Sequence, residues 1–197
     1  MKSLAIEREF GSGGREIGLK VAETAGIPYY DGELLHRAAE ALGLSVGMLE
    51  DYDEQRTGSF LYGLAAYTTS LQAQTGKNVF ELFYAVQRTM ERLHKDGPAV
   101  FIGRCSTEIL KKSSNVLRVY IYSSDPADRI RRTVQTEGVT EKEALRLIEK
   151  KDKQRSNYFR FWTEKEWKNR YNYDMGLNTS TLSVDTCAGI LLNALNS

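Results

Sequence analysis

The sequence predicts an α/β fold of three layers, in which helices cover both faces of a five-stranded parallel sheet. Short apolar runs alternate along the chain with segments of helical periodicity. The run 116–122 is apolar on both faces, as a buried parallel strand requires. Glycine and polar residues gather where the runs end. Ligands bind at that edge of a parallel sheet, so the same pattern indicates a binding site.

The first strand, helix and second strand are expected within the first 31 residues. Residues 3–7 form an apolar run that leads into the glycine cluster 11–14. Apolar residues then recur at helical spacing over 17–25, and Gly26 ends that helix. The apolar run 27–30 follows, which completes the start of a right-handed βαβ unit.

The segment 33–94 is predicted to be almost wholly helical, with two apolar stripes separated by a stretch rich in Tyr, Ser, Thr and Gly. The sequence predicts no definite structure for this stretch, 58–76. The second stripe fits a helix that packs on its own core, and it also fits the seam of a homodimer. Its members are Val79, Leu82, Phe83, Val86, Met90 and Leu93.

The second half of the chain continues the alternation. Further strands are expected at 98–102, 116–122 and 173–177. Pro126 fits the first turn of a helix, and a second helical pattern covers 141–151. Ser183 is placed to cap the last helix.

The composition limits the partners and the compartment. The chain has 27 Lys and Arg against 26 Asp and Glu, a net charge of +1, which argues against a broad basic surface for duplex nucleic acid. Its two cysteines have no metal-ligand spacing and fit reduced thiols. The N-terminus becomes charged too early for a signal peptide, and no apolar window approaches the about 20 residues that cross a bilayer. We therefore expect a cytoplasmic protein without membrane partners.

The glycine cluster has the chemistry of a phosphate-binding loop. The loop contains Gly11, Ser12, Gly13 and Gly14 in that order. Its three glycines lack a Cβ, so the backbone can turn tightly and direct successive N–H groups at one point. That point lies at the N-terminus of the next helix, whose dipole favours an anion. Arg15 adds a guanidinium there.

The charged segment 150–158 is a candidate lid. Phosphoryl transfer needs cations that close over the transferring group and exclude water. Lys153 and Arg155 could supply them, with Asp152 orienting one of the two. A solvated helix end explains the same residues equally simply.

Four segments, in the same order along the chain, carry a resemblance to a known family. They are 3–18, 30–37, 102–105 and 177–183. The second, YDGELLHR, stands where the family has Asp-Ser-Gly, three residues and Arg. The third, IGRC, stands where the family has Asp-Gly-Arg-Asp. Together they resemble the cytidylate kinase-like branch of the P-loop nucleoside monophosphate kinases.

The resemblance implies a P-loop NTPase-like fold and an organisation of the chain. The whole of 1–197 would form one kinase-like domain. Its core would comprise 1–31, 96–150 and 173–197, with a helical acceptor-binding insert at 33–95 and a lid at 150–170.

The resemblance also implies the substrates and the roles of residues. The chain would transfer the γ-phosphoryl group of ATP to a nucleoside monophosphate such as CMP, with Mg²⁺. The acceptor would lie near Asp31, Arg37 and Arg104. The donor phosphates would contact Gly11, Ser12, Gly13, Gly14, Arg15, Glu16, Arg129 and Arg132, and the catalytic cations would be Arg15, Lys153 and Arg155.

Two departures from the family pattern bear on activity. The usual loop ends in Gly-Lys followed by Ser or Thr, but here Gly13 and Gly14 precede Arg15, so that the lysine is missing. Ile102 replaces the carboxylate at the end of the third strand, and no metal ligand is assigned. A nucleotide-binding regulator without catalysis is therefore an alternative function. The mixture of aromatic and cationic residues over 155–171 suggests a further one, a module that binds single-stranded nucleic acid.

Overall fold

A computed structural model describes residues 1–31, 37 and 79–197. The chain forms two compact units, one made of Met1–Tyr30 and Asp96–Ser197 and the other of Asp31–Lys95. The first unit contains every strand of the described residues. The second includes nearly all of helix α5 (Val79–Asp96), which covers the second apolar stripe. A homodimer seam on that stripe stays a prediction.

The first unit is built on the five-stranded parallel sheet that the sequence predicts. Its strands are β1 (Ser3–Arg8), β2 (Tyr29–Tyr30), β3 (Val100–Ile102), β4 (Val116–Tyr122) and β5 (Met175–Asn178). They lie in the order β2-β3-β1-β4-β5, and each neighbouring pair is parallel. Strand β1 is central, and the chain crosses from β3 on one side of it to β4 on the other. Ligands of such sheets bind at the carboxyl ends of the strands where the order changes direction.

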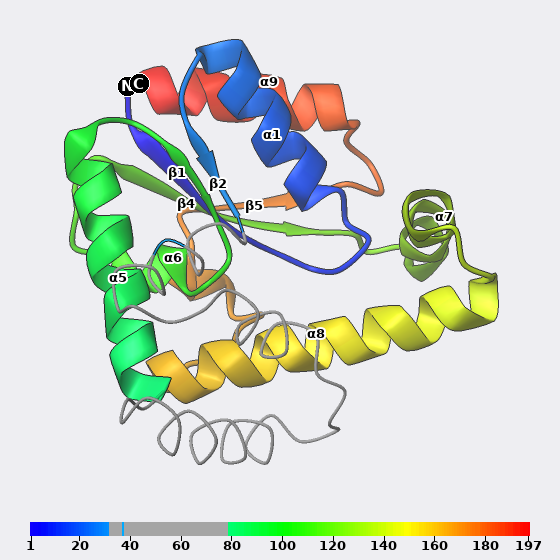
Figure 1. Cartoon of the computed structure of the whole chain (residues 1–197). Helices are drawn as coiled ribbons and strands as arrows, with labels where there is room; N and C mark the ends of the chain where they lie inside the picture. Colours follow the sequence, from blue (N-terminus) through cyan, green and yellow to red (C-terminus); the bar gives the residue numbers. More distant parts are fainter. Residues whose placement is uncertain (32–36, 38–78) are drawn as a thin grey trace. The chain divides into compact units, whose positions relative to one another are not determined.

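Helices cover the two faces of this sheet, which confirms the predicted three layers (Figure 1). Helices α1 (Gly14–Ala25) and α9 (Val184–Asn196) pack on one face, where Ile17 and Leu191 join the core of the strands. Helix α8 (Glu141–Thr163) lies on the other face. There Phe159 packs with Tyr120 and Trp167 in a second, aromatic core. The remaining elements of this unit are α6 (Ser106–Ile109), α7 (Pro126–Glu137) and the 3-10 helix η1 (Arg170–Asn172).

Local sequence signals set the helix boundaries. Gly26 ends α1 in the left-handed conformation at φ 64°, and Pro126 opens α7 next to its cap, Asp125.

Ser183 caps α9 as predicted, accepting a hydrogen bond from the backbone N–H of Thr186. A capping box formed by Thr140 and Glu143 fixes the start of α8.

Helix α8 is much longer than the predicted 141–151. It continues to Thr163, because no glycine or proline interrupts it, and it ends where Glu164 adopts φ 58°. The candidate lid segment 150–158 is therefore the middle of one continuous helix. Its closing motion stays a prediction.

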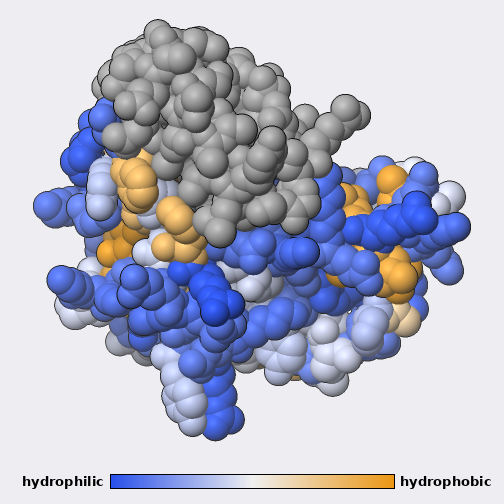
Figure 2. Space-filling view, turned by 90° about the horizontal axis from the view of Figure 1, so that it is seen from below, coloured by the Kyte–Doolittle hydropathy of each residue, from blue (hydrophilic) through white to orange (hydrophobic). Residues whose placement is uncertain are grey.

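Among the described residues, the surface in Figure 2 is mostly hydrophilic, with separate apolar areas. Leu145 of α8 and Tyr171 of η1 are among the exposed large hydrophobic residues. None of the helices within the described ranges carries an apolar stretch long enough to cross a membrane.

Candidate functional site

The glycine loop joins the carboxyl end of β1 to the N-terminus of α1. Gly11 and Gly13 have φ of 74° and 78°, a conformation that residues with a Cβ rarely adopt. Gly14 is buried and is the first residue of α1. The N-cap residue, Gly13, makes no side-chain cap hydrogen bond, so the loop leaves the backbone N–H groups of the first turn at the edge of the sheet. This is the geometry with which proteins bind a phosphate group.

Arg129 of α7 holds the loop through hydrogen bonds and ion pairs. Its Nε donates a hydrogen bond of 2.8 Å to the carbonyl of Phe10, and its guanidinium lies 2.6 Å from a carboxylate oxygen of Asp152. The other oxygen of Asp152 accepts a 2.8 Å bond from the backbone N–H of Phe10. A second ion pair, of 3.4 Å, joins Arg129 to Glu9. Arg129 thus positions the loop, and Asp152 serves Arg129 instead of the expected Lys153 or Arg155.

Arg132, one helical turn further, lies directly over the loop. A Cβ built on Gly13 would stand 3.1 Å from the Arg132 guanidinium carbon. The guanidinium also lies 3.0 Å from Glu16, in the first turn of α1. Of the two α7 arginines predicted from the sequence, Arg132 is the one that faces the surface of the loop. The carboxylate of Glu16 offsets part of the charge of this guanidinium.

Arg155 reaches the loop from α8. Its guanidinium donates a 3.0 Å hydrogen bond to the carbonyl of Arg8 and lies 5.3 Å from the centre of the Phe10 ring. Two of the predicted cations, Arg132 and Arg155, therefore lie against the same loop. Lys153 is exposed on α8.

The turn after β3 has an unusual backbone. Gly103, Arg104 and Cys105 follow one another with φ of 68°, 55° and 58°. The left-handed conformation costs a residue with a side chain roughly 1–2 kcal/mol, and such strain is concentrated at functional sites. The turn is held by a 3.0 Å hydrogen bond from the N–H of Ser106 to the carbonyl of Gly103. It places the Arg104 guanidinium 5.8 Å from the centre of the Tyr158 ring on α8.

The other predicted residues are placed less fully. Arg15 is exposed at the second position of α1. Asp31 and Arg37 belong to the second unit, and the residues 32–36 between them lie outside the described part of the chain. Their contact with an acceptor stays a prediction.

Comparison with protein families identifies the chain. Residues 3–181 match the model of the cytidylate kinase-like family, about nine tenths of the sequence. The chain belongs to the cytidylate kinase-like family. No curated protein matches it.

Solved structures give the same fold to this cytidylate kinase-like protein. An uncharacterized protein from Eubacterium ventriosum ATCC 27560 is 27% identical, with a TM-score of 0.74 over 100% of this chain and 99% of that one. A shikimate kinase from Bacteroides thetaiotaomicron is 13% identical, with a TM-score of 0.53 over 100% and 99%. A gluconokinase from Sinorhizobium meliloti 1021 is 13% identical, with a TM-score of 0.52 over 99% and 91%. The last two likenesses show the fold alone.

In this cytidylate kinase-like protein, two buried carboxylates that sequence reasoning missed lie beside the loop. Glu7 is 4% exposed, and its carboxylate accepts a 3.2 Å hydrogen bond from the Trp167 indole. Burial raises the pKa of Glu7, and the nearby charge of Arg8 opposes that rise. Glu9 is 7% exposed and pairs with Lys168 as well as with Arg129. In the sequence, the signal that could have found Glu7 is its place as a charged residue in the short apolar run 3–7.

Membership of the family implies that the protein uses a nucleotide, usually together with Mg²⁺. The residues at the usual Mg²⁺ positions do not fit that ion. Arg15 stands where the loop normally has a hydroxyl, and Ile102, 1% exposed, stands where β3 normally ends in a carboxylate. Glu16, the carboxylate in the first turn of α1, is paired with Arg132. Within the ranges that the structure describes, no cluster of three or more metal-ligating side chains occurs.

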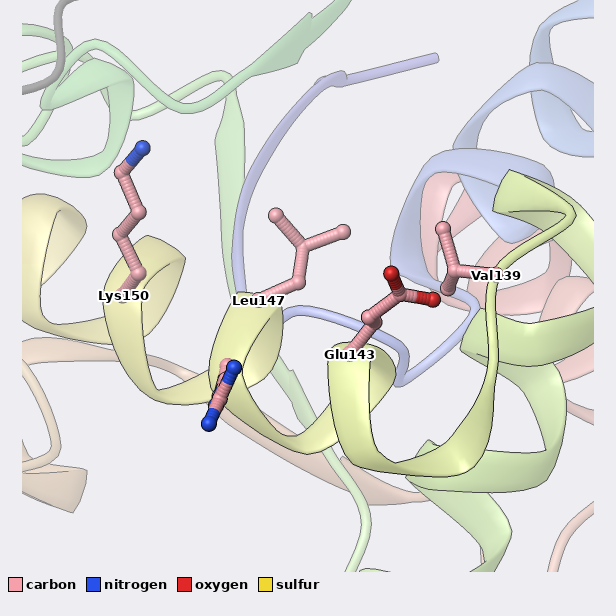
Figure 3. Close-up of a pocket in the computed structure, with 5 residues that line it drawn as sticks. Val139, Glu143, Leu147 and Lys150 are labelled. Atoms are coloured by element: carbon pink, nitrogen blue, oxygen red, sulfur yellow. The ribbon is translucent and has the colours of Figure 1, made fainter.

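A shallow pocket lies at the turn between α7 and α8 (Figure 3). Its lining combines aliphatic and charged side chains, which are Val139, Glu143, Arg146, Leu147 and Lys150. Lys150, the first residue of the candidate lid segment, lines it, but none of the residues predicted to bind the donor or the acceptor does. We therefore place the candidate site at the glycine loop.

Proposed function

We propose that the protein is a nucleotide-dependent phosphotransferase that moves the γ-phosphoryl group of ATP to a nucleoside monophosphate such as CMP, or to a related small phosphate acceptor. The observation that carries the proposal is the glycine loop. Gly11 and Gly13 hold the backbone in the left-handed conformation, Gly13 gives α1 an N-cap without a side-chain hydrogen bond, and Arg132 lies over the loop. Family membership supports a nucleotide kinase-type reaction.

The proposed chemistry relies on position and charge, with direct transfer between nucleotides and no covalent enzyme intermediate. The loop from Gly11 to Arg15 binds the donor phosphates through backbone N–H groups. Arg37 and Arg104 bind the acceptor phosphate. Lys153 and Arg155, together with Arg15, balance the charge of the transferring group.

The proposed setting of this reaction is the cytoplasm, where thiols stay reduced. Both cysteines, Cys105 and Cys187, are free and buried, which supports that setting.

A nucleotide-binding regulator without catalysis is the second candidate. The specific observations that favour it are Gly14 in the place of the loop lysine and the buried Ile102 at the end of β3. A module for single-stranded nucleic acid is less well supported. Phe159 and Trp167, which would stack on bases, are each 1% exposed and belong to the aromatic core.

Calorimetric titration separates these functions. We expect ATP and CMP each to bind the full chain, with ATP tested with and without Mg²⁺, and a short single strand not to bind. Mixing ATP with CMP should then produce ADP and CDP. Binding of ATP without any product would favour the regulator, and tight binding of the single strand would favour the third function.

A further inference from the structure

The side chain of Arg8 occupies the space that a side chain at position 14 would need. Arg8 is the last residue of β1, and Gly14 is the first residue of α1. A Cβ built on Gly14 would lie 2.6 Å from the Arg8 Cβ and 3.0 Å from its Cγ. Real Cβ atoms do not approach so closely, and rotation of the Arg8 side chain cannot move its Cβ. Gly14 is not in the left-handed region, so the close approach of Arg8 is what requires glycine there.

The guanidinium at the other end of Arg8 reaches the neighbouring strand. A Cβ built on Gly103 would overlap the Arg8 Nη1. Gly103 follows β3, and β3 pairs in parallel with β1, with Ile6 opposite Ile102. Arg8 therefore extends across the carboxyl ends of two adjacent strands, beside the N-terminus of α1. It is partly exposed at that edge.

The sequence pattern of the loop gives this placement a meaning. The standard phosphate loop reads Gly, four residues, Gly, Lys, then Ser or Thr. With Gly13 as its second glycine, the first glycine falls on position 8 and the lysine on position 14. This chain has Arg8 and Gly14 there, so the glycine and the cation have exchanged positions.

We propose that Arg8 supplies the phosphate-binding cation that a standard loop takes from its lysine. The inference rests on the proposed function and assigns this role to a residue that the motif does not mark. Glu7, which is 4% exposed, supports the placement, because its buried carboxylate interacts with the Arg8 charge. Arg155 holds the same residue from the backbone side, through the 3.0 Å bond to the Arg8 carbonyl. A guanidinium in this position can bind two phosphate oxygens at once.

A double-mutant cycle tests the exchange. Arg8→Gly, Gly14→Lys and the double variant are titrated as full chains with ATP and with inorganic tripolyphosphate. Arg8→Gly should weaken both affinities by about 10- to 150-fold, the effect of one charge-assisted contact. Gly14→Lys alone should also weaken binding, since its Cβ collides with Arg8. The double variant should bind more tightly than either single variant, which is strong non-additivity.

Three further measurements control for misfolding and for loss of positive charge in general. Gly14→Ala should lower the melting temperature in the wild-type background, and it should not do so in the Arg8→Gly background, where the collision is gone. Arg8→Lys should bind ATP more tightly than Arg8→Gly. Arg131→Gln removes an exposed arginine that pairs with Asp128 within its own helix, and it should leave ATP affinity unchanged.

The outcomes distinguish the two proposals. If wild type binds ATP and folded Arg8→Gly binds it equally well, the role of Arg8 is overturned and the proposed function stands. If wild type binds neither ATP nor tripolyphosphate, the proposed function fails and the role of Arg8 fails with it.

Discussion

At the scale of single residues, the glycines of the loop are required for different reasons. Gly11 and Gly13 need the left-handed backbone, whereas Gly14 needs the absence of a side chain. The sequence predicted the loop because glycine spacing is a local signal. It could not predict the contact between Gly14 and Arg8, because this contact depends on how β1 and α1 pack.

Replacing Gly11 should be more damaging than replacing another left-handed glycine. A Cβ on Gly11 would lie 2.7 Å from the Arg129 carbonyl and 2.7 Å from the Thr133 hydroxyl, whereas a Cβ on Gly138 meets nothing within 4 Å. Gly138→Ala should cost about 1 kcal/mol of stability, the strain of the conformation alone. Gly11→Ala should cost clearly more in chemical denaturation. Equal losses would contradict the packing of the loop against α7.

The buried Glu7 should make stability depend on pH. Burial raises its pKa above the ordinary 4.5, so the folded protein holds this proton more tightly than the unfolded chain. The contribution of Glu7 to stability is therefore full below pH 4.5 and is lost as pH rises through the folded pKa. In urea denaturation, the free energy of unfolding of wild type should fall relative to that of Glu7→Gln as the pH rises above 4.5.

Glu149→Gln, which replaces an exposed carboxylate by the same amide, is measured beside it as a matched substitution at the surface. If Glu7→Gln and wild type instead keep a constant difference across the range, the folded pKa of Glu7 is not raised.

At the scale of elements, the sequence predicted the strands and most helices, because apolar periodicity, Pro126 and Ser183 are local signals. Such local signals could not predict where α8 ends or which of its charged side chains face the loop. The segment 150–158 has five charged residues between positions 150 and 155, and only packing against the loop shows that Asp152 and Arg155 face inward. The same reason explains why the sequence could not predict that Arg129 supports the loop, whereas its contact with the nucleotide stays a prediction.

The ion pair between Arg129 and Asp152 should stabilise the attachment of the loop to α7 and α8. The two side chains are 11% and 14% exposed, so removing one partner leaves a largely buried charge. Asp152→Ala should lower the free energy of unfolding by about 3 kcal/mol. Asp128→Ala breaks a more exposed pair within α7 and should cost less than about 1 kcal/mol. Similar losses in the two variants would show that the loop does not depend on this pair.

At the scale of the whole molecule, four weak motifs in the correct order were enough to indicate the family, and the match over residues 3–181 confirms it. The acceptor could not be read in the same way. Cys105 and Ile102 replace the family residues on either side of the Gly103–Arg104 pair, and the chain from 38 to 78 lies outside the described residues.

An acceptor phosphate held by Arg37 should be visible as thermal stabilisation. CMP or a close relative should raise the melting temperature of wild type, and Arg37→Ala should lose that increase. Loss of the contact corresponds to about 1.5–3 kcal/mol of binding. The exposed Arg131, paired within α7, provides the control, and Arg131→Ala should keep the increase. If no nucleoside monophosphate stabilises wild type, the acceptor belongs to another class.

The most direct test of the central claim is to follow phosphoryl transfer by ³¹P NMR, with ATP, Mg²⁺ and the nucleoside monophosphates supplied one at a time. The phosphotransferase account predicts that ADP and one nucleoside diphosphate accumulate together at equal rates, in the presence of one preferred acceptor. ATP that remains intact with every nucleoside monophosphate, in the presence of folded protein that binds it, would contradict that account and leave a nucleotide-binding regulator.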